Sequence, residues 1–395
     1  MPDNHSRIPG FYRLSLRERI LRIAKLRGVD PRALGAVVNS GGLAVETADL
    51  MIENALGVLG LPFGVALNFR INGRPYIVPM ALEEPSVVAA ASHAAKRILV
   101  GGGFTAESTE PLMVAQVQLD EVGEPAAAAE RIRRAAPELL ALANEHLPNM
   151  VARGGGARDI EARDLGDGMM AVHVLVDCQN AMGANLLNAV AEGIGDRVAA
   201  IADAHLGIRI LSNYSDSRRT TAEARVPVTA LADDPAEGLR VARGIAQASL
   251  VAERDHYRAV THNKGVMNGV DGLVLATGND WRAVEAAAHA YAARDGRYQP
   301  LATWSLDEAA SVLSGRLELP LALGIVGGAL RAHEGAQLAL QLVGVRSATQ
   351  LAEVAACAGL ATNLAALRAL VTEGIQHCHM QLHRRASALK RRGAA

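Results

Sequence analysis

The sequence predicts an α+β protein, in which a small domain of ferredoxin-like type is inserted into a large, helix-rich α/β domain. Residues 111–215 are predicted to follow the order strand–helix–strand–strand–helix–strand, which is the order of that small fold. The segments on either side are mostly helical by the spacing of their apolar residues. Because 50% of the residues are hydrophobic but only 3% aromatic, the core must consist largely of Ala, Val, Leu and Ile.

With 395 residues, the chain is long enough for two domains that each bury a substantial core. We assign residues 1–110 and 216–374 to the large domain and residues 111–215 to the small one. Residues 375–395 are left as the remnant of a further C-terminal segment.

The first part of the large domain is predicted to hold helices and one β-hairpin. Asp30-Pro31 starts a helix, since proline is tolerated in a first turn, and Pro85 suits the first turn of another. Asn72-Gly73 is a typical hairpin turn. Helices are expected at residues 13–29, from 31 onward, at 47–57 and at 87–99, and strands at 65–68 and 76–79.

The later elements follow from the same patterns of apolar residues. In the small domain, strands are expected at 112–119, 160–163, 170–176 and 209–211, and helices at 126–147 and 185–194. The large domain resumes with a strand at 226–228 and helices at 236–251 and 349–373.

Bulk properties exclude several classes of protein. A net charge of −1 gives no electrostatic reason to expect nucleic acid as a partner. The three cysteines are scattered without a Cys-x-x-Cys pair, which favours a reducing compartment. No apolar signal core follows the N-terminus, and the longest apolar run, near 319–330, is shorter than the ~20 residues of a membrane helix. We therefore expect a soluble, cytoplasmic protein without a membrane anchor.

Residues 261–291 form the centre of the functional interpretation. Lys264 stands in a segment rich in Asn and Gly, which predicts a loop able to bend around a ligand. A short apolar run at 273–276 predicts a strand, and Asp280 is expected at or near the N-cap of the next helix. The simplest alternative is a surface loop, a buried strand and an ordinary cap. The other interpretation is a lysine and an aspartate that meet at a polar pocket.

Four more polar clusters occur along the chain. They are Glu53-Asn54-Ala55-Leu56-Gly57, Glu83-Glu84-Pro85-Ser86, Asp177-Cys178-Gln179-Asn180-Ala181-Met182-Gly183-Ala184-Asn185 and His377-Cys378-His379-Met380. Taken alone, the two glutamates before a helix are usually a favourable first-turn charge arrangement. Together with the segment around Lys264, and in this order, the clusters resemble 3-hydroxy-3-methylglutaryl-coenzyme A (HMG-CoA) reductase of class II, the soluble bacterial type, from about residue 8 to 385.

The resemblance implies an oxidoreductase that interconverts HMG-CoA with mevalonate and CoA through mevaldehyde, by two hydride transfers from NAD(P)H. It places Lys264 at the carbonyl oxygen, where negative charge develops. Glu84 supplies a proton to the alkoxide. Asp280 bonds with both Lys264 and Glu84 and tunes their protonation. His379 protonates the departing CoA thiolate. Whether the reaction makes mevalonate or consumes it stays open.

The cofactor is expected at a turn of small residues that opens a helix. Backbone N–H groups at a helix start can hold a pyrophosphate, although such a turn is more often only structural. The resemblance assigns this role to Met182, Gly183, Ala184 and Asn185, with Asn180 in place of the family's usual aspartate.

The choice between NADH and NADPH depends on a second segment. NADH-preferring relatives tend to carry an aspartate where this chain has Leu147. Because leucine has no carboxylate, the repulsion of a 2′-phosphate at this position is reduced. His146 and Arg153 could favour that phosphate, so we lean to NADPH and keep NADH open.

Substrate contacts are implied for five residues. Arg13 matches a position near the CoA phosphates, and Arg258 is suited to the free carboxylate of the substrate, because a guanidinium binds a carboxylate in bidentate fashion. The remaining contacts are Ser86, Asn213 and Asn268. Asn54 belongs to a motif at the family's subunit interface, which implies a homodimer or higher oligomer with shared active sites.

No metal is expected. His379 and His383 are four residues apart near His377 and Cys378, but no carboxylate or second cysteine pair joins them. Relatives continue past the catalytic histidine into a mobile flap, whereas this chain stops at Ala395, which predicts a truncated flap. One alternative is therefore a flap-deficient, non-catalytic or impaired family member that binds CoA ligands. Another is a CoA-thioester hydrolase or transferase that uses Glu84.

Overall fold

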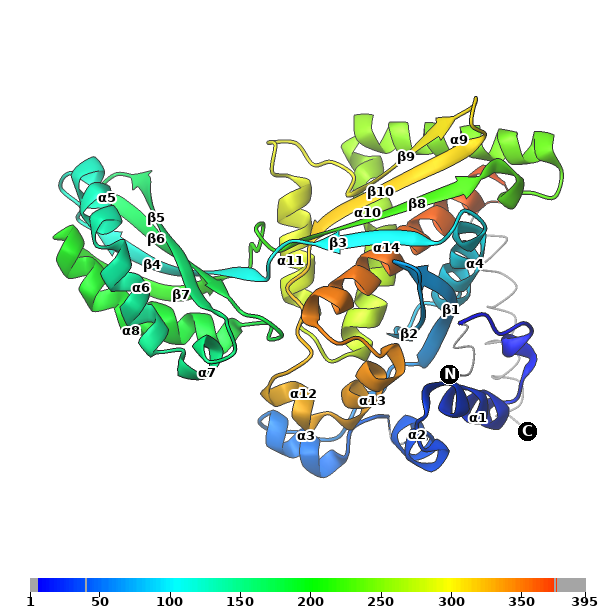
Figure 1. Cartoon of the computed structure of the whole chain (residues 1–395), viewed down its shortest axis with the longest axis horizontal. Helices are drawn as coiled ribbons and strands as arrows, with labels where there is room; N and C mark the ends of the chain where they lie inside the picture. Colours follow the sequence, from blue (N-terminus) through cyan, green and yellow to red (C-terminus); the bar gives the residue numbers. More distant parts are fainter. Residues whose placement is uncertain (1–5, 40, 373, 375–395) are drawn as a thin grey trace.

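The computed structural model describes residues 6–39, 41–372 and 374. It contains one six-stranded sheet with strand order β2-β1-β3-β8-β10-β9 and one four-stranded sheet with order β5-β6-β4-β7. Helices cover both sheets, and Figure 1 shows the smaller unit to the left of the larger one. The prediction of a mixed α+β protein is confirmed. The predicted C-terminal remnant, including His379, lies outside the described residues.

The six-stranded sheet combines strands from both ends of the chain. The hairpin β1–β2 turns at Asn72-Gly73, as predicted, with both residues at positive φ. β3, β9 and β10 were not predicted. β3 is only five residues long, which is too short to show a clear alternation. The strands are β1 Phe63–Ile71, β2 Arg74–Ala81, β3 Phe104–Ser108, β8 Arg219–Pro227, β9 Ala302–Asp307 and β10 Val312–Pro320.

Two long helices form the centre of the larger unit. α14 (Ala348–Val371) is buried along most of its length and packs against α10 (His256–Ala276). By length and composition α14 could cross a membrane, but two thirds of its apolar window is buried inside the fold, as in a core helix. The surrounding helices are α4 Val87–Val100, α9 Pro235–Arg254, α11 Trp281–Ala292, α12 Gly328–Ala332 and α13 Glu334–Val343, with the 3-10 turn η2 Val228–Ala230.

The loop and strand expected between residues 261 and 276 are wrong, because the whole segment belongs to α10. The glycines of this segment allow neighbouring elements to pack closely on α10, and they do not form a turn. A Cβ built on Gly269 would lie 2.3 Å from the carbonyl oxygen of Ala358 in α14, and one on Gly272 would lie 2.7 Å from Cε of Met80 in β2. Tertiary contact therefore overrides the weak helix propensity of Asn and Gly.

The N-terminal segment is helical, with shifted bounds. α1 (Leu16–Arg27) begins at a capping box between Ser15 and Glu18. α3 ends at Met51, and the chain continues without helix to Gly57, where the predicted third helix was to end. Pro85 lies outside α4, whose N-cap is Ser86. The other elements here are η1 Phe11–Arg13, α2 Pro31–Asn39 and α3 Val45–Met51.

The four-stranded sheet is antiparallel throughout and has its own apolar core beneath its helices. The single helix expected over 126–147 is broken at Ala135, because Pro137 cannot donate a backbone hydrogen bond in a continuous helix. The elements are β4 Leu112–Asp120, α5 Pro125–Arg134, α6 Ala136–Glu145, α7 Pro148–Val151, β5 Gly156–Gly166, β6 Met169–Asp177, α8 Ala184–Ala202 and β7 His205–Ser212. The bounds predicted for the two domains stay a prediction.

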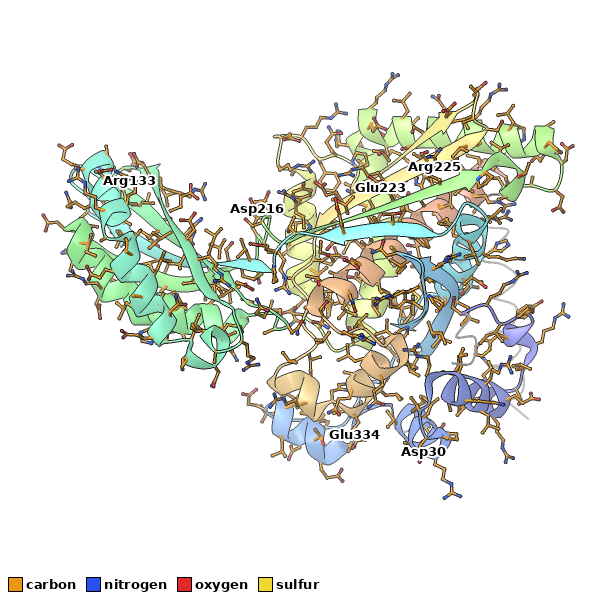
Figure 2. The ribbon with its side chains drawn as sticks, in the orientation of Figure 1. Asp30, Arg133, Asp216, Glu223, Arg225 and Glu334 are labelled. Carbon is orange, nitrogen blue, oxygen red and sulfur yellow. The ribbon has the colours of Figure 1, made fainter. Side chains whose placement is uncertain are left out.

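The two units meet at a narrow connection. The chain passes from β3 to β4 and returns from β7 to β8 (Figure 1). Asp216 lies at this connection, whereas Arg133 lies on a helix of the smaller unit, away from it (Figure 2). The units also contact each other where Ala181 forms an isolated parallel β-bridge with Val326. The segment that opens α8 is thus held against the larger unit.

Candidate active site

Lys264 and Glu84 meet although they are 180 residues apart in the chain. The Nζ of Lys264 in α10 donates a short hydrogen bond to Oε2 of Glu84, which lies between β2 and α4. The packing of α10 on β2 brings the two together. Lys264 is 60% exposed and Glu84 29%, and an ion pair in that setting contributes at most about 1 kcal/mol to stability. Stability alone therefore gives little reason for this pair.

Glu84 also lines a cavity of about 870 Å³. Ser86 lines it from a left-handed backbone conformation, with φ 79°, which is costly for a residue other than glycine. Its buried Oγ has no hydrogen-bond partner among the described residues. The cavity extends to η1, where Nε of Arg13 bonds the hydroxyl of Tyr12, one of the lining residues. Further basic lining residues are Arg7, Arg19 and Lys96.

One face of α10 carries a row of polar side chains. Asn268 follows Lys264 by one turn and Asp271 by two, so the three lie on the same side of the helix. Arg258 lies near the start of α10, about 120° around the axis from Lys264, and is half-buried. Burial lowers the pKa of Arg258. The structure therefore brings Asn268 to the side of Lys264 and leaves Arg258 on an adjacent side.

Asp280 is the N-cap of α11, as predicted, and its Oδ1 accepts a bond from the backbone N–H of Ala283 at 3.1 Å. It also lies 3.6 Å from the guanidinium of Arg282. Within the described part of the chain, no bond joins Asp280 to Lys264 or Glu84. The Cα of Lys264 lies about 18 Å along the axis from the end of α10. The expected contact of Asp280 with both residues stays a prediction.

The turn expected to hold a cofactor has the predicted form. Gly183, with φ 110°, is the N-cap of α8, and no side-chain hydrogen bond caps this helix start. A Cβ at Gly183 would lie 2.5 Å from Sγ of Cys178, so only glycine fits. Met182, Ala184 and Asn185 are adjacent. The first N–H groups of a 19-residue helix are thus available to a negatively charged group.

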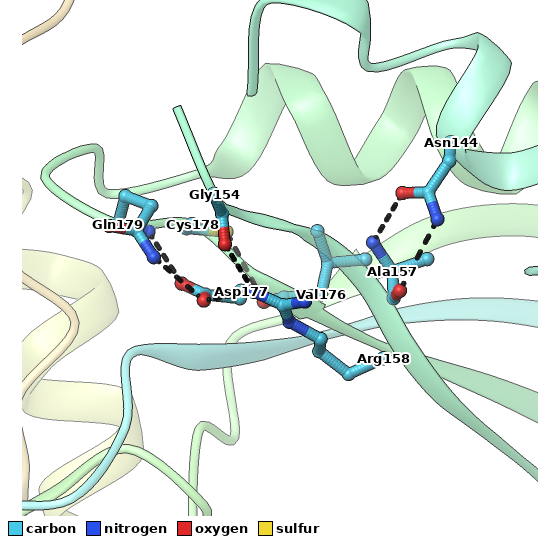
Figure 3. A network of polar contacts seen from close by, with 8 residues as sticks. All are labelled: Asn144, Gly154, Ala157, Arg158, Val176, Asp177, Cys178 and Gln179. Atoms are coloured by element: carbon cyan, nitrogen blue, oxygen red, sulfur yellow. Dashed lines mark hydrogen bonds and ion pairs between the residues drawn. The ribbon is translucent and has the colours of Figure 1, made fainter. Parts of the chain in front are cut away.

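A polar network holds the glycine loop 154–156 beside this turn (Figure 3). Asp177 accepts bonds from Nη2 of Arg158 at 3.0 Å and from the backbone and side chain of Gln179 at 3.0 and 2.7 Å. Arg158 also donates to the carbonyl oxygen of Gly154, and Asn144 exchanges bonds with the backbone of Ala157. The end of β6 and the glycine loop are therefore fixed to each other.

The other residues predicted near the cofactor are more scattered. The ring of His146 packs against Gly193, about 13 Å along α8 from its start, so the structure does not bring it to residues 182–185. Arg153 is exposed, and its Nε donates to the carbonyl oxygen of Asn149 at 2.9 Å. Leu147 is buried in the core of the smaller unit. Asn213 is exposed just after β7, at the connection between the units.

The sequence analysis missed a polar cluster between α10 and α11. Asp271 bonds Glu285, and Nε2 of His289 lies 2.6 Å from Glu285. Nδ1 of His289 lies 2.7 Å from the hydroxyl of Tyr298. Burial, and then the neighbouring Glu285, raises the pKa of Asp271 to about 8. Two signals could have found the cluster: the spacing of Lys264 and Asp271 by two helical turns, and the Glu285–His289 pair at i, i+4.

Among the described residues, no group of three or more His, Cys, Asp or Glu side chains is placed to hold a metal ion. The histidines at 377, 379 and 383 are outside that part of the chain. Cys178 and Cys357 are free, buried thiols. Burial raises the pKa of Cys178 to about 12, so it carries no thiolate at neutral pH.

Comparison with known proteins identifies the family of the chain. The family model of hydroxymethylglutaryl-coenzyme A reductase matches residues 15–384. The chain is 45% identical to 3-hydroxy-3-methylglutaryl-coenzyme A reductase of Archaeoglobus fulgidus, over 97% of this chain and 87% of the relative. It is 36% identical to a protein of Borreliella burgdorferi named as a probable reductase of the same kind, over 84% of this chain and 76% of the relative.

Solved structures agree with the sequence comparisons. The class II 3-hydroxy-3-methylglutaryl-CoA reductase of Streptococcus pneumoniae, bound to NADPH in open conformations, superposes with a TM-score of 0.89 at 41% identity. The match covers 92% of this chain and 99% of that one. The family model's match over residues 15–384 includes Glu84, Lys264 and Asp280. The chain therefore belongs to the hydroxymethylglutaryl-coenzyme A reductase family, in its class II.

Proposed function

We propose that the protein reduces HMG-CoA to mevalonate and free CoA by two hydride transfers from NADPH or NADH, with mevaldehyde between them. The observation that carries this proposal is the Lys264–Glu84 pair, in which Glu84 also lines a large cavity. A cation and a carboxyl group are the two groups that carbonyl reduction needs, one to stabilise the oxyanion and one to supply its proton. The four-stranded unit is assigned to the cofactor, and the larger unit to HMG-CoA.

Each residue of the pair has a distinct role. When the reduced nicotinamide delivers hydride to the thioester carbon, the carbonyl oxygen gains a negative charge, which the ammonium of Lys264 stabilises. The hemithioacetal then releases CoA as a thiolate, which His379 protonates, and leaves mevaldehyde. A second hydride reduces the aldehyde, and Glu84 gives a proton to the alkoxide. Asp280 tunes the protonation of the pair. The sum consumes two hydrides and two protons for each HMG-CoA.

The cavity suits the CoA part of the substrate. It is largely apolar, which fits a pantothenate chain, and Arg7, Arg19 and Lys96 supply positive charge for phosphates. Arg13, next to the lining residue Tyr12, is assigned to the same phosphates. Ser86, whose buried Oγ has no partner within the described residues, is assigned to the substrate. Asn213, Arg258 and Asn268 complete the substrate contacts, with Arg258 on the free carboxylate.

The cofactor fits the start of α8. The uncapped N–H groups at Gly183 suit the pyrophosphate, and the absence of a side chain there permits close approach. Met182, Ala184 and Asn185 complete this contact. The exposed Arg153 can accept a 2′-phosphate, whereas His146, packed on α8, is less suited. We therefore favour NADPH, in agreement with the ligand of the Streptococcus pneumoniae structure.

A homodimer with shared active sites is supported by an exposed apolar segment. Leu50, Leu56 and Leu59 are 89%, 102% and 95% exposed, which is unusual for leucine on a monomer's surface. The segment contains Asn54, from the predicted interface motif. We place the protein in the cytoplasm as a soluble enzyme.

The proposal is tested by absorbance at the nicotinamide band, with purified protein, HMG-CoA, and NADPH and NADH in parallel. We expect oxidation of two cofactors for each CoA released, and faster turnover with NADPH. A CoA-thioester hydrolase or transferase would instead release CoA without any change in the nicotinamide. Reduction of mevaldehyde without reduction of HMG-CoA would indicate an impaired family member. The absence of both activities in a folded protein would contradict the proposal.

A further inference from the structure

Arg218 is a buried cation at the connection between the two units. It precedes β8 directly and is only 4% exposed. Its Nη1 donates to the carbonyl oxygens of Ala181 and Met182 at 3.2 and 3.3 Å, and its Nη2 donates to that of Leu323. No carboxylate forms an ion pair with it in the described part of the chain. One side chain thus joins the turn before α8 to a segment of the larger unit.

The segment reached by Arg218 is in turn bonded to the residue before Asp280. The backbone N–H of Gly324 donates to Oδ1 of Asn279 at 2.7 Å, and Nδ2 of Asn279 donates back to the carbonyl oxygen of Gly324 at 3.1 Å. Asn279 is buried, so neither bond competes with bulk water. Three segments are therefore bonded one after another, and they are here called the Arg218 stack. They are residues 181–182, residues 323–324 and Asn279.

Close packing shows that the stack has little freedom. A Cβ at Gly324 would lie 2.6 Å from the backbone nitrogen of Met182, so the two segments touch through their backbones. The N–H of Ile325 also donates to the carbonyl oxygen of Asn180 at 2.9 Å. The side chain of Asn180 accepts from the N–H of Ala348 at the start of α14 at 2.9 Å. The turn before α8 is therefore held to the larger unit from two sides.

Charge gives a further reason for the position of Arg218. Burial lowers the pKa of Arg218 to about 10, which still leaves it a cation at neutral pH. It lies beside the positive end of the α8 dipole, where a second positive charge is unfavourable unless an anion is bound. Its desolvation is offset by three carbonyl oxygens, an arrangement that a flexible ammonium cannot reproduce.

We propose that Arg218 is a positioning residue that fixes the cofactor turn at Ala181–Met182 to the segment carrying Asn279 and Asp280. This inference rests on the proposed function, because it assigns the turn to the cofactor and Asp280 to the chemistry. Arg218 itself is buried and touches neither ligand. It holds the cofactor turn in one fixed relation to the segment that carries Asp280, so its loss affects the cofactor and the hydride step but leaves the binding of HMG-CoA unchanged.

The first experiment compares Arg218→Met with a matched control, Arg97→Met. Arg97 is also a partly buried arginine that bonds a backbone carbonyl and has a pKa lowered to about 10, but it lies on α4 outside the stack. For Arg218→Met we expect about a tenfold or greater rise in the Kd of NADPH, followed by nicotinamide fluorescence, and a similar fall in kcat. The KM for HMG-CoA should stay within about twofold. In Arg97→Met, the Kd of NADPH, kcat and the KM for HMG-CoA should each stay within about twofold of the values for the unmodified protein.

A second pair of variants keeps the test decisive if Arg218→Met does not fold. Gly324→Ala separates the segments of the Arg218 stack by one methyl group without removing any charge, and Gly123→Ala is its control, because nothing lies within 4 Å of a Cβ there. Gly324→Ala should lower kcat and weaken NADPH binding in the same ratio, whereas Gly123→Ala should change neither. Arg218→Lys should recover much of the NADPH affinity through its charge, but not kcat.

Two results would overturn the inference. One is an unchanged Kd for NADPH together with an unchanged kcat in folded Arg218→Met or Gly324→Ala. The other is an equal effect in the two control variants, which would indicate only a general loss of stability. Failure of the proposed function is distinguishable, because it appears as the absence of cofactor oxidation by the unmodified protein.

Discussion

Two polar clusters lie along the same face of α10, and their surroundings differ. The Lys264–Glu84 pair is open to solvent and borders a cavity, whereas the Asp271–Glu285–His289 cluster is partly buried between α10 and α11. In the second cluster, burial and then the neighbouring Glu285 raise the pKa of Asp271 to about 8. One helix face therefore carries a solvent-exposed ion pair at one place and, two turns further on, polar groups that contact the next helix.

The comparison gives each cluster a different expected response to substitution. Changes in the open pair should affect turnover and leave stability nearly unchanged, because exposed ion pairs contribute little to folding. Changes in the buried cluster should affect stability and its dependence on pH. The cluster also joins α10 to α11, the helix that Asp280 caps.

The largest effect is expected from Glu84→Gln. The amide cannot give a proton to the alkoxide, so kcat for HMG-CoA reduction should fall by about 10²–10⁴-fold. The free energy of unfolding, measured by urea denaturation, should change by less than about 0.5 kcal/mol. Glu83→Gln is the neighbouring control and should retain most of the activity. A Glu84→Gln protein that turned over normally would remove the main distinction between the two clusters.

A smaller effect is expected from Asp271→Asn. Because the pKa of Asp271 is raised from its ordinary 3.8 to about 8, the folded protein binds a proton that the unfolded chain does not. Its contribution to stability is thus present at low pH and is lost as pH rises from about 4 to about 8. Asparagine cannot ionise, so the variant should be more stable than the unmodified protein at pH 9, by about 1–2 kcal/mol.

The control for this substitution is Asp167→Asn, in an exposed turn after β5. It should leave the pH dependence of the melting temperature unchanged. If Asp271→Asn also left that dependence unchanged between pH 5 and 9, the cluster would not hold the proton that its geometry indicates.

The smallest effect is expected from His289→Gln. The hydrogen bond to Glu285 raises the pKa of His289 above its ordinary 6.5. The ion pair is therefore fully present below pH 6.5, and its contribution is lost as pH rises through the higher pKa of the folded state. The half-exposed pair should contribute about 0.5 kcal/mol at pH 5.5 and nothing at pH 9. Thermal melts at these two pH values measure the difference, and an equal loss at both would exclude the ion pair.

Helix caps and turns near the candidate site were predicted better from the sequence than the segment that carries Lys264. Asp280 is an N-cap and Gly183 opens α8, because caps and turns depend on the residues themselves. Lys264 was placed in a loop, because Asn and Gly were interpreted without the neighbours that make Gly269 and Gly272 necessary. Local propensity cannot show that a glycine in a helix serves contact with another helix.

The sequence also gave no sign of what depends on distant contacts. Arg218 resembles any arginine in a charged connection, and its burial follows only from the approach of residues 181–182 to 323–324. The pKa of Asp271 is raised by burial and then by Glu285 of α11, and both depend on the packing of α11 on α10. β3 was too short to show a period. Such features become visible only when the chain is folded.

The most direct test of the account is the reduction of HMG-CoA and of mevaldehyde by Lys264→Ala, beside the unmodified protein, with CoA binding measured by calorimetry. The account predicts that both reductions fall by about 10²–10³-fold while the Kd of CoA stays within about threefold, because the ammonium stabilises charge that exists only in the transition state. Near-normal turnover of either substrate would contradict the role assigned to Lys264.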